Sequence, residues 1–167
     1  MTDPGRFPLA YFITFTCYGT RLHGDPRGTV TRRRNQPGTP VLGENDLWRR
    51  IEETRLDNAS PYFGPRERGV VHRTTEEVCQ YRGWQLHALN VRTNHVHLVA
   101  TARCHPDKVM GDVKRWSTRR LAEAGLVDQG SKVWTTHGST RFLWNRRDLR
   151  AACEYVMHRQ GPDLPMA

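Results

Sequence analysis

Two histidines separated by a single residue are the side chains of this sequence best suited to bind a metal ion. His95 and His97 flank Val96 in a run of β-branched and apolar residues that favours an extended strand. Residues two apart in a strand project from the same side, with Cβ atoms about 6.5–7 Å apart, so both imidazoles can share one ion. The alternating residues Val96, Leu98 and Ala100 are expected to be buried. Most His-x-His pairs are ordinary surface histidines, so the assignment needs support from the rest of the chain.

The periodicity of apolar residues and the positions of Pro, Gly and Asn predict seven elements around this pair. Their order is strand, helix, strand, strand, helix, strand or hairpin, helix, within residues 9–18, 65–82, 84–92, 95–101, 106–124, 132–144 and 145–160. A tight hairpin is expected at Thr93 and Asn94. The first six elements match an α+β fold of the ferredoxin-like, split βαβ type, an antiparallel four-stranded sheet with two helices on one face. The seventh is a C-terminal helix.

The alternation expected in a strand and the periodicity expected in a helix predict which residues share a face of each element. In the strand at 84–92, one face is expected to carry Trp84, Leu86, Ala88 and Asn90. Asn145 can cap the last helix, with Asp148 three residues further on. The apolar side of that helix is predicted to consist of Leu149, Ala152, Cys153 and Val156.

Residues 20–64 have no clear period and are rich in Gly, Pro and Asn. They include the basic cluster Arg32, Arg33 and Arg34 and one short amphipathic piece around 46–56. We predict one domain over residues 1–167 in which this stretch is an insertion between the first strand and the first helix. A structureless loop of that length is uncommon in a compact domain unless it is functional. Two interpretations therefore stay open, a substrate-facing lobe whose arginines bind DNA and a solvated basic loop.

The balance of charge favours a polyanionic partner. The chain has 26 Lys and Arg against 17 Asp and Glu, a net charge of +9, which attracts nucleic acid first and an anionic membrane surface second. It has no apolar run of about 18 residues and no charged-then-apolar N-terminal signal, so we expect a cytoplasmic protein without a membrane partner. The cysteines form no Cys-x-x-Cys pair, so a zinc ribbon is not indicated.

A basic face is predicted on the helix at 106–124. Lys108, Arg115 and Arg119 cluster almost opposite its apolar side on a helical wheel. A charged helix face is more often simply solvated, but the net charge of +9 makes contact with phosphates an equal alternative here. DNA binding through these three residues is therefore one of two interpretations.

The segment from Asn94 to Val99, the basic helix after it and Tyr155 near the chain end together resemble one known group. They are similar to the HUH endonucleases, specifically the single-tyrosine transposases of small insertion sequences and the REP-associated tyrosine transposases. The resemblance spans Tyr11 to Gly161 without the insertion. It implies that His95 and His97 bind a metal ion and that Tyr155 is the nucleophile.

The same resemblance implies a third metal ligand, an amide on the helix that bears the tyrosine. Family members usually place Asn or Gln four residues after the tyrosine, one turn along the helix. Here that position is Arg159, and Gln160 follows it at about 140° from Tyr155 on an ideal wheel. Either the last turn is distorted and Gln160 reaches the metal, or His158 takes its place. We favour Gln160.

What the resemblance implies about activity is specific. Tyr155 attacks a phosphate of single-stranded DNA, forms a 5′-phosphotyrosine and releases a 3′-hydroxyl, and a second 3′-hydroxyl later rejoins the strand. Two imidazoles and an amide suit Mg²⁺ or Mn²⁺ and leave positions for phosphate oxygens, although imidazole pairs also accept Zn²⁺, Ni²⁺ or Co²⁺. The expected substrate is DNA with hairpin-forming ends. The choice between a monomer and a homodimer stays open.

Two other functions compete with this hypothesis. The first is a non-catalytic, ferredoxin-like module that binds single-stranded nucleic acid, in which the histidines are incidental and exposed aromatic residues stack on bases. The second is a replication-type nickase with the same chemistry. Tyr155 itself has a plainer interpretation, as an amphipathic residue at the edge of the last helix. The other tyrosines Tyr11, Tyr18 and Tyr81 lie in patterns typical of core residues, and Tyr62 lies in the insertion.

Overall fold

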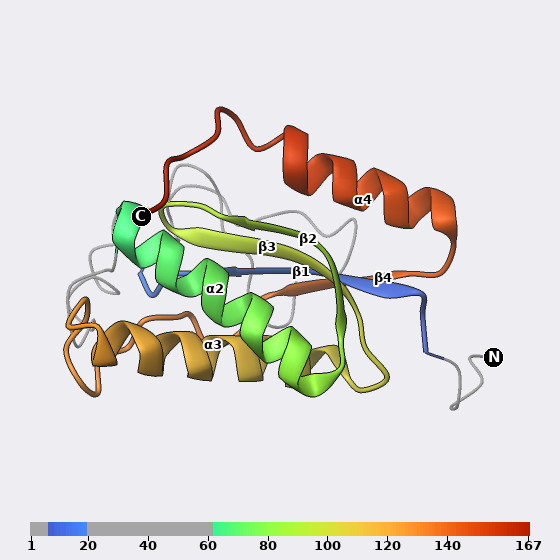
Figure 1. The fold of residues 1–167 in the computed structure, drawn as a ribbon. Coiled ribbons are helices and arrows are strands. Elements are labelled where there is room, and N and C mark those ends of the chain that lie inside the picture. The colour runs from blue at the N-terminus through green and yellow to red at the C-terminus, as the bar shows by residue number, and fades with distance from the viewer. Residues whose placement is uncertain (1–6, 20–61) are drawn as a thin grey trace, which may run out of the picture.

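A four-stranded antiparallel sheet forms the centre of the molecule, with helices on both of its faces (Figure 1). The computed structural model describes residues 7–19 and 62–167. The strands are β1 (Ala10–Thr16), β2 (Gln85–Val91), β3 (His95–Thr101) and β4 (Ser139–Leu143), and the helices are α2 (Pro65–Arg82), α3 (Pro106–Glu123) and α4 (Arg146–His158). The spatial order β2-β3-β1-β4 is that of the split βαβ arrangement. The predicted fold class is therefore confirmed, including the C-terminal helix. Most of the predicted insertion, with Arg32, Arg33 and Arg34, lies outside the described residues.

Local signals in the sequence place the helix ends. Pro65 occupies the first turn of α2, and Gly83 ends this helix at φ 68°, a left-handed conformation that glycine adopts without strain. The side chain of Asn145 accepts a hydrogen bond from the backbone N–H of Asp148, 2.9 Å away, and so caps α4 as predicted. The predicted strand at 132–144 is shorter than expected, because Trp134 forms only an isolated bridge with Cys17.

The sheet separates two hydrophobic clusters. On one face, helices α2 and α3 pack over alternate residues of the two central strands, among them Ile13, Phe15, Val96, Leu98 and Ala100. On the other face, α4 packs over a smaller cluster made of Ala10, Ala88, Val99, Leu143, Ala152 and Val156. Alternation along β3 therefore buries Val96, Leu98 and Ala100 as predicted and directs His95 and His97 to the face of α4.

Strand β2 departs from the predicted alternation. A shift of register between Leu86 and Ala88 inserts one extra residue into the ladder. Trp84 and Leu86 pack against the cluster under α2 and α3, whereas Ala88 belongs to the cluster under α4. The expectation that these residues share one face was wrong, because the bulge changes the side to which the strand directs its residues. As a consequence, Asn90 pairs with His97, and both side chains lie on the face of the sheet that α4 covers.

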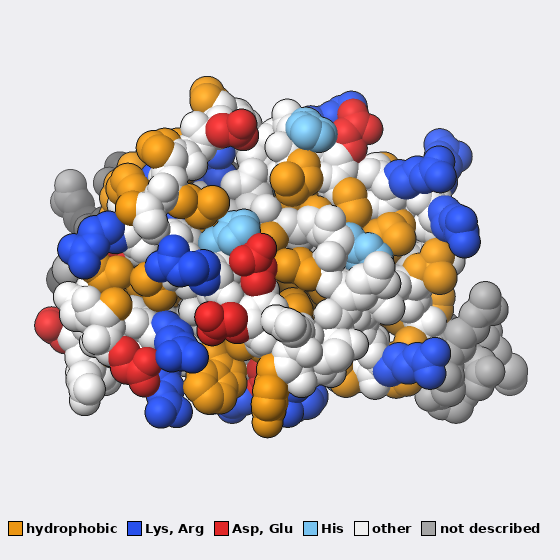
Figure 2. Space-filling view, viewed as in Figure 1, with side chains coloured by type: hydrophobic (Ala, Val, Ile, Leu, Met, Phe, Trp, Pro, Cys, Tyr) orange, Lys and Arg blue, Asp and Glu red, His pale blue; other side chains and the backbone are white. Residues whose placement is uncertain are grey.

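The surface over α2 and α3 carries mixed charge. Figure 2 shows Lys and Arg side chains interspersed with Asp and Glu side chains over these two helices.

Within residues 7–19 and 62–167, none of the helices is both long and apolar enough to cross a membrane.

Candidate active site

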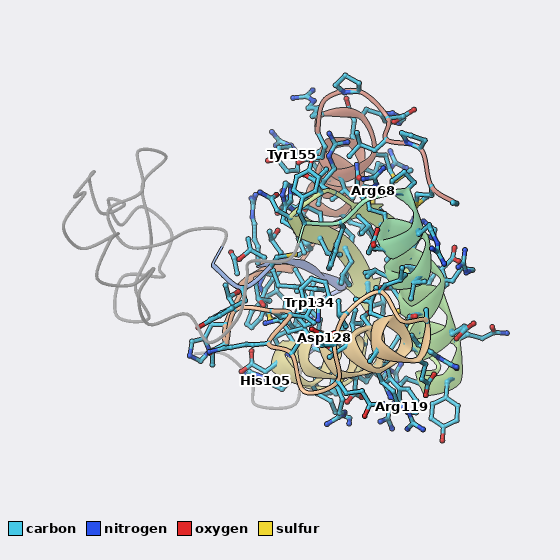
Figure 3. The ribbon with its side chains drawn as sticks, turned by 90° about the vertical axis from the view of Figure 1, so that its left-hand side faces the viewer. Arg68, His105, Arg119, Asp128, Trp134 and Tyr155 are labelled. Atoms are coloured by element: carbon cyan, nitrogen blue, oxygen red, sulfur yellow. The ribbon has the colours of Figure 1, made fainter. Side chains whose placement is uncertain are left out.

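Three of the residues singled out in the sequence converge on the face of the sheet covered by α4. The imidazoles of His95 and His97 have ring centroids 4.7 Å apart on the central strand β3. The phenol ring of Tyr155, on the last turns of α4, has its centroid 6.0 Å from that of His97. Figure 3 shows Tyr155 on the α4 side of the sheet. Elements that are far apart in the sequence thus bring the histidine pair and the tyrosine into contact.

His97 is the more buried of the two histidines, with 7% of its surface exposed. Its Nδ1 lies 2.7 Å from the hydroxyl of Thr14, which faces it across the β1–β3 ladder. Burial, the nearby His95 and the charge of Arg92 together hold its pKa at about 4, and a hydrogen bond to the side chain of Gln160 opposes that shift. His97 is therefore neutral at pH 7, which is the form that binds a metal ion.

The low pKa of His97 predicts a pH-dependent stability of the metal-free protein. The unfolded chain takes up a proton near pH 6.5 that the folded chain does not take up until about pH 4. The free energy of unfolding should therefore fall as the pH drops from about 6.5 to 4, by up to about 3 kcal/mol. Urea denaturation in EDTA at half-unit pH steps measures the free energy of unfolding as a function of pH. In the variant His97→Gln this free energy should depend less steeply on pH. A variant curve as steep as that of the wild type would contradict the assignment.

His95 is held by its neighbour in the chain. Its Nδ1 lies 2.7 Å from Oδ1 of Asn94, an oxygen that can only accept, so Nδ1 carries the proton. A histidine whose Nδ1 donates in this way binds a metal through Nε2. In His97 the Nδ1 atom is likewise occupied, by Thr14. Both rings are thus oriented to use the same nitrogen.

Gln160 reaches His97 because α4 ends before it. The helix stops at His158, Arg159 leaves helical geometry, and Gly161 adopts φ 84°. The amide nitrogen of Gln160 donates to the carbonyl of Tyr155 at 3.3 Å, and the side chain of Gln160 also forms a hydrogen bond with His97. The angle of about 140° expected on an ideal wheel does not apply here, since residue 160 is not helical.

His158 takes a different position. Its side chain is exposed on the last turn of α4, and among the described residues it has no contact with either histidine of the pair. Of the two candidates for the third ligand, the structure brings only Gln160 to the site.

The phenol of Tyr155 is accessible to a substrate. The residue is 43% exposed, and its ring packs edge-on against Phe12 and His97 while its hydroxyl has no hydrogen-bond partner among the described residues. Two other tyrosines lie elsewhere in the structure. Tyr11 is buried and donates its hydroxyl to the carbonyl of Cys104. Tyr81 is 82% exposed on α2, so its predicted place in the core was wrong, because it lies on the outward side of that helix.

Three residues of the site were missed by sequence reasoning. Thr14 holds His97, Phe12 supports the ring of Tyr155, and Asn90 donates its amide N–H to the carbonyl of Val156 at 2.9 Å. The last bond ties the end of α4 to the strand beside β3. Alternation within the first strand was a signal for Thr14, since it is a polar residue between the buried Ile13 and Phe15. No signal in the sequence indicated Asn90, because its orientation depends on the bulge.

The basic residues of α3 lie on the other side of the sheet from Tyr155, as Figure 3 shows for Arg119. They are also paired with carboxylates. Lys108 and Arg115 both contact Asp112, which is 2% exposed, and Arg119 contacts Glu123 at 3.0 Å. The structure does not bring Lys108, Arg115 and Arg119 to the candidate site.

The donor set fits a divalent ion with open coordination positions. Two imidazoles and one side-chain amide provide three possible donors beside an exposed phenol, and phosphate oxygens can complete the coordination sphere. In the part of the chain that the structure describes, no three His, Cys, Asp or Glu side chains come together as a metal site. Among the described residues, the amide of Gln160 is therefore the candidate for the third protein ligand of a metal ion at this face.

This combination defines a class of protein. A histidine pair on a central strand of a four-stranded antiparallel sheet, faced by a tyrosine on the C-terminal helix, is the arrangement of the HUH single-tyrosine transposases. Residues 60–157, more than half of the chain, match the family described as transposase IS200 like. The chain belongs to this family of transposases, enzymes that cut and rejoin DNA, which confirms the resemblance noted in the sequence.

Two solved structures are similar to this chain. One is a REP-associated tyrosine transposase bound to a REP hairpin, with 14% identity, a TM-score of 0.46, and coverage of 93% of this chain and 70% of that chain. The other is a crystal structure described as a transposase from Deinococcus radiodurans R1, with 14% identity, a TM-score of 0.47, and coverage of 100% and 98%. No curated protein matches this sequence at a significant level.

Proposed function

We propose that this transposase is a metal-dependent endonuclease and strand transferase of single-stranded DNA that acts through a 5′-phosphotyrosine at Tyr155. The observation that carries the proposal is the contact between the exposed phenol ring of Tyr155 and the ring of His97, which itself contacts His95. A nucleophile of this type must lie beside the groups that orient the scissile phosphate.

The chemistry assigns one role to each residue. The phenol oxygen of Tyr155 loses its proton to solvent or a base and forms a bond to phosphorus, while the bond from phosphorus to the 3′ oxygen breaks and that oxygen gains a proton. His95, His97 and the amide oxygen of Gln160 would hold a divalent ion, Mg²⁺ or Mn²⁺, which polarises the phosphate and favours the phenolate. Thr14 and Asn94 keep both imidazoles in the orientation that this binding requires.

The proposed partner is single-stranded DNA with a hairpin near the cleavage position. The net charge of +9 supports binding to a polyanion. Membership in the transposase family supports DNA as that polyanion. The hairpin comes from the resemblance to REP-associated tyrosine transposases and is the substrate with which the proposal should be tested.

The competing hypothesis of a passive single-strand binder has less support. Such modules stack bases on exposed aromatic residues of the two central strands of the sheet. Here α4 packs over that face, and the aromatic ring of Phe12 on β1 contacts His97 and Tyr155. The surface that a passive binder would need is used to assemble the histidine and tyrosine cluster.

A covalent trapping experiment tests the proposed reaction. We expect that incubation with a labelled single-stranded hairpin DNA and Mn²⁺ produces a protein–DNA adduct that survives boiling in detergent, and that peptide mapping places the DNA on Tyr155. Omitting the metal or adding EDTA should remove the adduct. DNA binding without any adduct, or an adduct on another residue, would favour the competing hypothesis.

The third ligand can be tested by a matched pair of variants. Gln160→Ala should lower the affinity for Mn²⁺ by about tenfold or more, because it removes an oxygen donor, whereas His158→Ala should leave the affinity unchanged. Titration of Mn²⁺ followed by electron paramagnetic resonance measures both. A larger loss in His158→Ala than in Gln160→Ala would assign the third position to His158 instead.

A further inference from the structure

Arginines of this protein differ in whether a carboxylate already neutralises them. On α2 and α3, Arg82 and Arg115 contact Asp112, and Arg119 and Arg120 contact Glu123. Arg92 and Arg141, by contrast, have no carboxylate partner among the described residues. A guanidinium without a carboxylate partner can bind phosphate without first giving up an existing ion pair.

Arg92 lies beside the proposed metal site. It follows β2 at the hairpin turn, where its backbone N–H donates to the carbonyl of His95 at 2.8 Å. Its Nη1 donates to the carbonyl of Pro162 at 2.9 Å, so the guanidinium is held against the segment that carries Gln160. The positive charge of the Arg92 guanidinium therefore lies next to the histidine pair.

Arg141 lies on the opposite side of the same site. It is exposed on β4, an edge strand, and pairs with Phe12, whose ring centroid is 5.8 Å from that of Tyr155. Paired residues of neighbouring strands share a face, and Leu143, two residues further along, packs under α4. The side chain of Arg141 is thus on the same face as Tyr155 and about one strand spacing of 4.8 Å beyond Phe12.

We propose that Arg92 and Arg141 bind phosphates on the two sides of the scissile phosphodiester and so set the path of the DNA strand across this face. This inference rests on the proposed function, since it takes Tyr155 and the histidine pair as the position of the scissile phosphate. The path runs from the end of β2, past His95 and His97 on β3 and beside the exposed ring of Tyr155, to Arg141 on β4. It excludes the basic face of α3, which lies on the other side of the sheet (Figure 3).

The test measures DNA binding in a Tyr155→Phe background, so that no cleavage occurs. In that background Arg92→Gln and Arg141→Gln should each weaken binding of single-stranded hairpin DNA about tenfold. Each should also reduce the slope of log affinity against log salt by about 0.7, the change expected for one lost phosphate contact. Arg119→Gln, which removes the same charge from α3, is the matched control and should bind like the parent. Arg92→Lys should retain the salt slope, because it keeps the charge.

Mn²⁺ titration of the same variants separates this role from a structural one. Neither Arg92→Gln nor Arg141→Gln should weaken Mn²⁺ binding, since neither side chain supplies a metal donor and losing a positive charge does not disfavour a cation. Unchanged DNA affinity in both variants would overturn the inference. An equal loss of DNA affinity in Arg119→Gln would also overturn it, and would indicate that DNA binds the basic face of α3. Failure of the proposed covalent reaction would show itself separately, in the trapping experiment with the unmodified protein.

Discussion

Replacing Tyr155 with phenylalanine should abolish the covalent protein–DNA adduct and lower strand cleavage by at least about 10³-fold, because the substitution removes the nucleophilic oxygen. The ring contacts with Phe12 and His97 would be kept, since they involve the ring and not the hydroxyl. The hydroxyl has no hydrogen-bond partner among the described residues, so folding should not depend on it. Single-turnover cleavage of a labelled hairpin DNA measures the effect.

Three controls make this result specific. The melting temperature of Tyr155→Phe and its affinity for hairpin DNA should match those of the unmodified protein. Tyr81→Phe removes a hydroxyl from an exposed tyrosine on α2 and should leave cleavage unchanged. Persistence of the adduct in Tyr155→Phe would mean that another residue is the nucleophile.

Removing either imidazole of the histidine pair should have the second largest effect. His95→Ala and His97→Ala each take away one of three proposed donors, so Mn²⁺ affinity should fall at least about 100-fold and cleavage should fall with it. His97→Ala should also destabilise the fold, because His97 is 7% exposed and hydrogen-bonded to Thr14. His95→Ala is the cleaner variant, since His95 is only half-buried.

The histidine variants need a control of the same type. His72 lies on α2 and contacts Glu76, on the side of the sheet away from Tyr155, so His72→Ala should bind Mn²⁺ and cleave DNA normally. Partial return of cleavage in His95→Ala at millimolar Mn²⁺ would agree with a weakened site. Normal Mn²⁺ affinity in His95→Ala would show that the pair is not a metal site.

The order of the elements and the fold class followed from local patterns. Pro65 and Gly83 marked the ends of α2, Asn145 marked the start of α4, and alternation along β3 separated the histidines from the buried Val96 and Leu98. These features depend on residues close together in the sequence, and for that reason they can be read from it. The bulge in β2 could not, since it depends on how that strand pairs with β3.

The sequence by itself determined which side chains are available for chemistry, namely a histidine pair that must share one face of a strand and a tyrosine on the last helix. Only the tertiary structure decided that the two meet, because α4 packs on the same face of the sheet. It also decided between Gln160 and His158 as neighbours of His97. Residue 160 lies beyond the end of α4, where helical geometry no longer dictates the direction of a side chain. Its hydrogen bonds with Tyr155 and His97 fix that direction instead.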